Sequence, residues 1–88
     1  MDEQRFVSWL QSDLHLTEKS ARDVLSRMRR ACQYDVDLSS PITDDELVFW
    51  MGQHPEFQQL SFSVRSQIRR AVRLARAFER EEMVKADR

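Results

Sequence analysis

Apolar side chains recur at helical spacing between residues 18 and 33, and this pattern limits the fold more than any other feature of the sequence. At about 100° per residue these positions fall within an arc of about 120°, the width of a core-facing helix stripe. They are Ala21, Val24, Leu25, Met28, Ala31 and Cys32. The chain has one glycine and two prolines in 88 residues, so it lacks the turn residues that β-hairpins need. Together these two features predict an all-α fold.

Three other segments show the same spacing and complete the expected architecture. They cover residues 3–13, 44–53 and 62–82, and the stretch EFQQL before the last of them predicts one extra helical turn. The connections are short, and neither a repeat nor a break in composition divides the chain. We therefore expect one domain over residues 1–83, a compact bundle of four main helices, followed by a frayed tail at 84–88.

The segment ITDDELVFWM contains the clearest helix start in the chain. Thr43 and Glu46 form a T-x-x-E capping box there, and the following GQHP is expected to end the helix. Thr17 is the expected N-cap of the second helix, and Ser61 or Ser63 that of the last. These local signals predict the helix boundaries independently of the apolar stripes.

Two adjacent aromatic residues in the same segment cannot both point into the core from one helix. We expect Phe49 to be exposed and Trp50 to pack inward with its neighbours, which gives the inward set Leu47, Val48, Trp50 and Met51. An exposed aromatic side chain is a candidate interface anchor. The alternative is that the segment HPEFQQL folds over it.

Several classes of site lack the residues that they need. A single cysteine, Cys32, excludes an internal disulfide, and we expect it to be a small buried apolar residue. His15 and His54 have no clustered partners, and one glycine cannot make a phosphate-binding loop. We therefore expect no enzyme activity, metal, cofactor or small-molecule substrate. Without a signal-peptide pattern or a membrane-length apolar run, we expect a cytoplasmic protein that has no membrane contact.

Charge is strongly segregated along the chain, although the net charge is only −1. Residues 34–60, here called the acidic segment, contain six acidic residues and no lysine or arginine. Residues 61–88 contain eight basic and four acidic residues. Such patterning bears on binding partners more than the total charge does.

Five arginines of the last helix fall within an arc of about 80° that borders its apolar stripe. They are Arg65, Arg69, Arg73, Arg76 and Arg80. Like charges four residues apart repel one another and destabilise a helix, so this stripe of five arginines needs an explanation. It could contact phosphates, pair with the acidic segment in the same chain or a second copy, or be a plain solvated face. On the second helix, Glu18 precedes Arg22 by four residues and could match its charge, whereas Arg29 has no such partner.

The stretch FVSWLQSDLHLTEKSARDVLSRMRRACQY resembles the opening of the core-binding domain of tyrosine recombinases, which has a SAM-like four-helix fold. The matching residues are Phe6, Trp9, Leu10, Leu16, Thr17, Ser20 and Arg22. The resemblance covers residues 5–33 and, more loosely, 57–80, and it does not include the catalytic domain. In that family the domain clamps duplex DNA through backbone contacts. The resemblance thus implies a stand-alone DNA-contacting domain that does not recombine DNA by itself.

Two hypotheses about function follow. In the first, the chain is a non-enzymatic DNA-binding or DNA-associated module that contacts duplex phosphates, mainly through its basic C-terminal helix. Its contact residues would be Lys19, Arg22, Arg29, Arg65, Arg69, Arg73 and Arg76. In the second, it is a protein-interaction adaptor or inhibitor of the kind that mobile elements encode, and it docks or self-associates through Phe49, Asp35 and Asp37. A continuous basic strip would favour the first hypothesis, and interleaved acids and bases would favour a protein partner or a plain surface.

Overall fold

The computed structural model describes residues 1–86 and contains no strand within that range. Its helical elements are α1 (Glu3–Ser12), α2 (Glu18–Ala31), the short 3-10 turn η1 (Cys32–Tyr34), α3 (Asp44–Gly52), α4 (Pro55–Gln58) and α5 (Phe62–Ala86). The all-α prediction is confirmed, with four main helices and α4 as the extra turn. The SAM-like assignment stays a prediction.

The helix starts follow the capping signals in the sequence. The hydroxyl oxygens of Thr17, Thr43 and Ser61 each accept a hydrogen bond from the backbone N–H three residues later, at 3.1, 3.1 and 3.2 Å. Each bond satisfies one of the N–H groups that a helix start leaves unpaired. The predicted N-caps are therefore confirmed, and Ser61 rather than Ser63 begins α5.

The helix ends agree less well with the predictions. The GQHP segment ends α3 as expected, with Gly52 as the last helical residue and Gln53 as the C-cap in an ordinary right-handed conformation. Helix α5 runs to Ala86, beyond its predicted end near residue 82. Of the expected frayed tail at 84–88, residues 87 and 88 lie outside the described residues, and the preceding three belong to α5.

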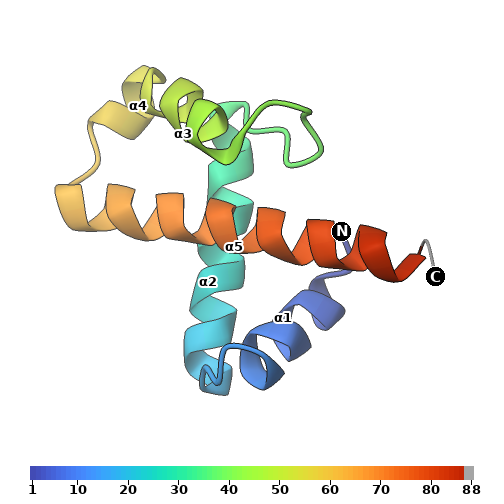
Figure 1. Cartoon of the computed structure of the whole chain (residues 1–88). Coiled ribbons are helices and arrows are strands. Elements are labelled where there is room, and N and C mark those ends of the chain that lie inside the picture. Colours follow the sequence, from blue (N-terminus) through green and yellow to red (C-terminus); the bar gives the residue numbers. More distant parts are fainter. Residues whose placement is uncertain (87–88) are drawn as a thin grey trace.

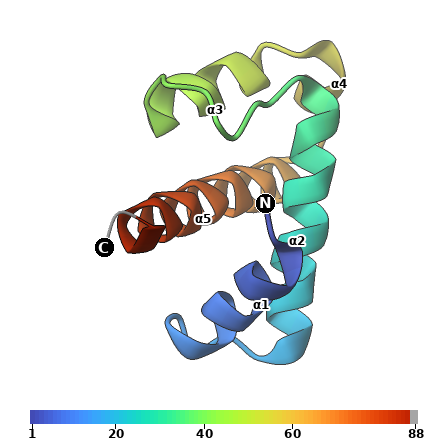
Figure 2. The same cartoon turned by 90° about the vertical axis from the view of Figure 1, so that its right-hand side faces the viewer.

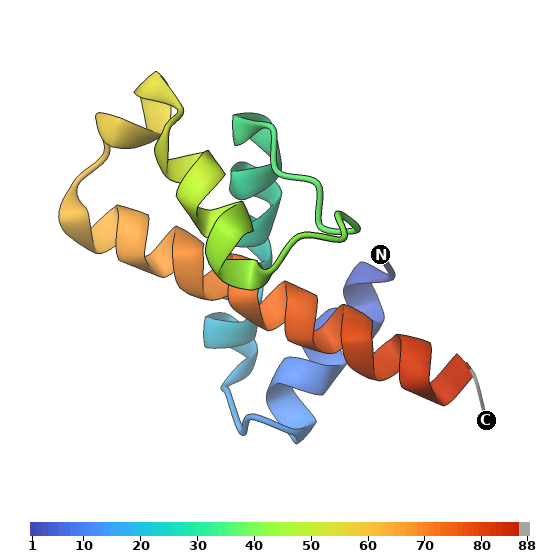
Figure 3. The ribbon, with the colours of Figure 1, turned by 45° about the horizontal axis from the view of Figure 1, so that its top comes forward.

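Helix α2 is the spine of the molecule, and α5 lies across it (Figure 1). On one side of α5, α1 packs against the N-terminal half of α2. On the other side, α3 and α4 lie near the C-terminal end of α2 (Figure 2). The long loop from η1 to α3 runs away from the C-terminal end of α2 and brings the start of α3 to the middle of α5 (Figure 3). This arrangement divides the core into two clusters.

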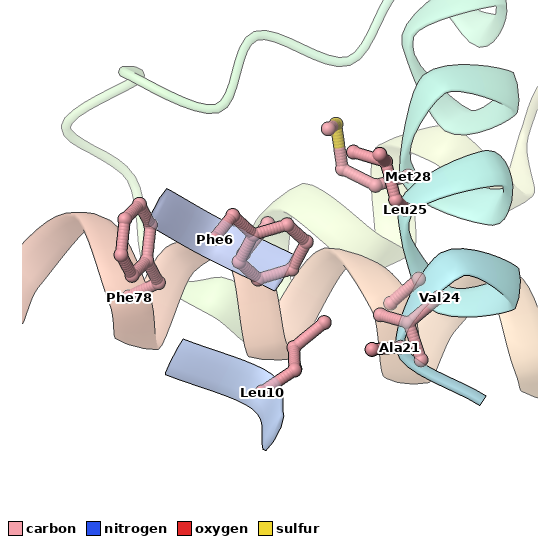
Figure 4. Packing of buried hydrophobic residues seen from close by; sticks show 9 residues of the cluster. Phe6, Leu10, Ala21, Val24, Leu25, Met28 and Phe78 are labelled. Carbon is pink, nitrogen blue, oxygen red and sulfur yellow. The ribbon is translucent and has the colours of Figure 1, made fainter. Parts of the chain in front are cut away.

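The first cluster joins α1, α2 and the middle of α5, from Ala71 to Phe78 (Figure 4). The rings of Phe6 and Phe78 meet there with their centroids 5.4 Å apart, and Leu10 is fully buried beside them. The predicted α2 stripe supplies the facing side chains, namely Ala21, Val24, Leu25 and Met28.

The second cluster joins the C-terminal end of α2 to η1, α3, α4 and the N-terminal half of α5. Phe57 brings α4 into this cluster, where its ring meets Tyr34 edge-on with centroids 5.6 Å apart. The EFQQL stretch thus fills the core with an aromatic ring and does not lie over the surface.

The expectation that Cys32 is buried was wrong, because the residue is exposed. Helix α2 ends at Ala31, and the chain tightens into the 3-10 turn that places Tyr34 in the core. The backbone of Ala31 (φ −57°, ψ −38°) is still α-helical, so Cys32 keeps the direction that α2 gives it; it is exposed because it lies at the end of the stripe and belongs to neither core cluster.

Candidate interaction surfaces

The two predicted phosphate-contact arginines of α2 are held by carboxylates. Arg29 forms a two-point contact with Glu3, with Nε and Nη2 donating at 2.6 and 2.9 Å, and so ties α2 to α1. These bonds lower the pKa of Glu3 and raise the pKa of Arg29. Arg22 donates to Glu18 at 3.1 Å, as the four-residue spacing predicted. Neither guanidinium is without a carboxylate partner.

The C-terminal half of the arginine stripe pairs with the first turn of α3. Arg73 lies 2.8 Å from Asp45, and Arg80 donates to both oxygens of Asp44 at 3.0 and 3.1 Å. Hydrogen bonding to Arg80 is the main cause of the lowered pKa of Asp44. Among the uses considered for the stripe, pairing with the acidic segment within one chain is therefore realised at these positions.

Arg76 does not belong among the phosphate contacts, because its side chain is in the protein interior with only 7% of the residue exposed. Its Nε donates to Asp44 at 3.0 Å, and its two terminal nitrogens donate to the backbone carbonyls of Leu38, Ser40 and Ile42. The guanidinium thus holds the loop before α3 against α5. The prediction of a solvent-facing role for this residue is wrong.

A helical-wheel signal for this burial was present in the sequence. Arg76 follows Val72 by one turn and is adjacent to Ala75, so it lies at the edge of the apolar stripe. Arg65 lies on the same arc, however, and is only partly buried. The wheel alone could not say which of the two the loop would cover.

Lys19, Arg65 and Arg69 form no ion pair within residues 1–86. Arg69 Nη2 donates to Ser66 Oγ at 3.4 Å, and Arg65 Nε is buried without a hydrogen-bond acceptor in that range. These are the remaining predicted phosphate contacts that carry no carboxylate partner in the described chain.

The predicted basic residues are not all brought together. Arg22 and Arg29 line a hollow of about 760 Å³ alongside α1, where the acids Glu3 and Glu82 also lie. Arg73 lines a different hollow, of about 780 Å³, between α5 and the loop before α3. Acids and bases are thus interleaved around Arg22, Arg29 and Arg73, and these three residues do not line one common hollow.

The outer side of α3 carries two exposed aromatic rings, here called the aromatic face. Phe49 is 57% exposed and Trp50 is 62% exposed, with ring centroids 5.3 Å apart and planes at 75°. The prediction for Phe49 is confirmed, but the inward packing of Trp50 and the cover by HPEFQQL were both wrong. The inward side of this short helix is filled by Leu47, Val48 and Met51.

A hollow of about 260 Å³ adjoins Trp50 and contains one of the two predicted acidic interface residues, Asp35. Asp35 follows η1 in the left-handed conformation (φ 60°), which aspartate tolerates better than most residues, and its side chain is 93% exposed. Asp37 does not line this hollow, because it turns to accept hydrogen bonds from the backbone and hydroxyl of Ser39 at 2.9 and 2.6 Å. Those bonds lower its pKa.

No helix in the described part of the chain is long and apolar enough to cross a bilayer, and residues 1–86 contain no group of three or more His, Cys, Asp or Glu side chains arranged to hold a metal ion.

Comparison with known proteins provides no independent assignment. No protein-family model, curated protein or solved structure matches the chain. The resemblance to recombinase core-binding domains therefore stays a prediction.

Proposed function

We propose that this protein is a non-enzymatic interaction module that binds a protein partner through the aromatic face of α3. The observation that carries the proposal is the exposure of two adjacent large aromatic rings, Phe49 and Trp50, on one helix. Fully burying one such side chain contributes about 1.5–3 kcal/mol of stabilisation. The fold leaves much of this stabilisation unrealised at both rings. Contiguous exposed apolar surface of this kind is typical of protein-binding sites.

The electrostatics of the aromatic face indicate the character of the partner. Glu46 is exposed on the same helix and forms no ion pair within residues 1–86, whereas Asp45 is paired with Arg73. Asp35 lines the hollow beside Trp50, and the acidic segment contains no lysine or arginine. Complementary charge across an interface guides encounter and suppresses wrong partners. The partner surface that fits is an apolar recess bordered by positive charge.

The test is affinity capture from extracts of the native host, followed by titration of the purified partner against matched variants. Phe49→Ser combined with Trp50→Ser should weaken binding at least about tenfold, the loss expected for interface anchors. Phe62→Ser is the matched control, since Phe62 is also exposed (71%) but lies at the start of α5. Circular dichroism establishes that each variant is folded. Full affinity in the double variant would refute the proposal.

A second candidate, DNA-phosphate contact, is favoured because three of the predicted contact residues form no ion pair within residues 1–86. Arg65 and Arg69 are one turn apart on α5, and guanidinium groups bind phosphates by two-point contacts. Lys19, at the start of α2, is the third. The resemblance to core-binding domains adds to this candidate, whereas the interleaved acids argue against it.

A fluorescence-anisotropy titration with labelled duplex DNA over a salt series tests this candidate. Contact through these three residues predicts a slope of about −2 to −3 in log affinity against log salt. The variant Arg65→Glu with Arg69→Glu should abolish binding, and Phe49→Ser with Trp50→Ser should leave it unchanged. An absence of binding at low salt would eliminate the DNA candidate.

A further inference from the structure

The hollow beside Trp50 has the size of one side chain. Its volume of about 260 Å³ is below the roughly 300–1,000 Å³ of sites that hold small-molecule ligands. Its floor consists of core residues of the second cluster, including Val36, Leu47 and Met51, which are all buried. A guest could therefore place an apolar stem against an apolar floor that the fold has already formed.

The residues that line the hollow favour a bound side chain with a positively charged end group. Trp50 and Asp35 both line the hollow, and the Trp50 residue and the Asp35 side chain are both exposed. A guanidinium over an indole face is the more frequent and stronger type of cation–π contact. His54 also lines the hollow; its Nε2 lies 3.9 Å from Asp35, and its Nδ1 accepts the backbone N–H of Glu56.

We propose that the hollow between Trp50, Asp35 and the floor of the second core cluster receives an arginine side chain from a partner peptide segment. This inference rests on the proposed function and names the chemistry that the aromatic face recognises. Arginine fits better than lysine, because its planar and weakly hydrated guanidinium stacks on a ring while donating to a carboxylate. Residues 34–60 contain no lysine or arginine, and Arg30, which reaches the lining of the hollow from α2, donates its Nε to the Tyr34 hydroxyl at 3.3 Å and forms no ion pair with Asp35.

The test uses two short peptides that differ in one functional group. Acetyl-Leu-Arg-Leu-amide and acetyl-Leu-citrulline-Leu-amide have the same shape, but citrulline is uncharged. Each is titrated into the full chain and followed by heteronuclear NMR, in a buffer alkaline to the ordinary histidine range. Trp9 serves as an internal control, because its indole N–H donates to Glu81 at 2.8 Å in the other core cluster.

The arginine peptide should shift the indole signal of Trp50 and not that of Trp9, and should bind roughly tenfold more tightly than the citrulline peptide. Asp35→Asn should bring the two affinities together, whereas Asp37→Asn should leave the difference unchanged. Equal affinities in the wild-type chain would overturn the arginine assignment. Binding of a protein partner through Phe49 and Trp50 would still be tested separately by the double variant Phe49→Ser with Trp50→Ser. Movement of the Trp50 signal on protein dilution alone would also overturn it, because a second copy would then occupy the hollow.

Discussion

Replacing Arg76 with methionine tests the main structural claim, namely that one buried guanidinium holds the loop before α3. The substitution keeps an apolar stem of similar reach and removes four hydrogen bonds, one to Asp44 and three to loop carbonyls. A hydrogen bond that involves a charged group is worth about 1.5–3 kcal/mol. The four values do not add, because the carbonyls belong to a surface loop that water can reach, and Asp44 keeps Arg80 as a partner.

We therefore expect a loss of about 3 kcal/mol in the free energy of unfolding, at the lower end of what breaking a buried pair costs. A chain of this length has a total stability of about 4–13 kcal/mol, so the loss is a large share of it. The unfolding midpoint should fall by roughly 12–24 °C. Urea titration and calorimetry measure the two quantities, and hydrogen exchange at residues 38–43 should become faster.

Arg73→Met is the matched control, because Arg73 is on the same helix but is exposed and forms one ion pair, with Asp45. Exposed pairs contribute about 0–1 kcal/mol. If Arg76→Met costs no more than this control, the guanidinium does not hold the loop and the reasoning fails.

Three further predictions concern pH, capping and the thiol. The pKa of Asp44 is lowered in the fold by Arg80 and then by Arg76, so its contribution is present above its ordinary value of 3.8 and is lost as the pH falls through the folded value. Asp44→Asn should therefore lower the urea midpoint at neutral pH and lose this deficit in acid; an equal deficit at both pH values would contradict the assignment. Thr43→Ala should cost about 1 kcal/mol in urea titrations through the lost N-cap, and a loss below about 0.3 kcal/mol would show that the cap is not needed. Although Cys32 is exposed, desolvation of its thiol by nearby atoms, followed by the charges of Asp37 and Glu3, raises the pKa of Cys32. Its alkylation at neutral pH should therefore be slower than that of free cysteine; an equal or faster rate would count against this environment.

Local features of the fold could be predicted from the sequence, because the interactions that cause them span only a few residues. The apolar stripe of α2 and the caps at Thr17 and Thr43 depend on helical periodicity and on bonds three residues apart. The Glu18–Arg22 pair is of the same kind. Such features needed no knowledge of how the helices pack.

The candidate surfaces were predictable only in part, because they depend on contacts between distant segments. Arg29 gains Glu3 from another helix, and Trp50 is exposed because other residues of the short helix α3 fill its inward side. Nothing in the local pattern around either residue identifies these partners or neighbours.

The sequence by itself determined that the chain is all-α and that the last helix has a basic arc beside its apolar stripe. Only the tertiary structure decided the use of each arginine on that arc. Arg76 lies under the loop before α3 and donates its hydrogen bonds to the loop carbonyls and to Asp44, whereas Arg65 and Arg69 form no ion pair in the described residues. The physical reason is that helical periodicity sets the direction of a side chain, while the element that packs there determines whether it meets a carbonyl, a carboxylate or water.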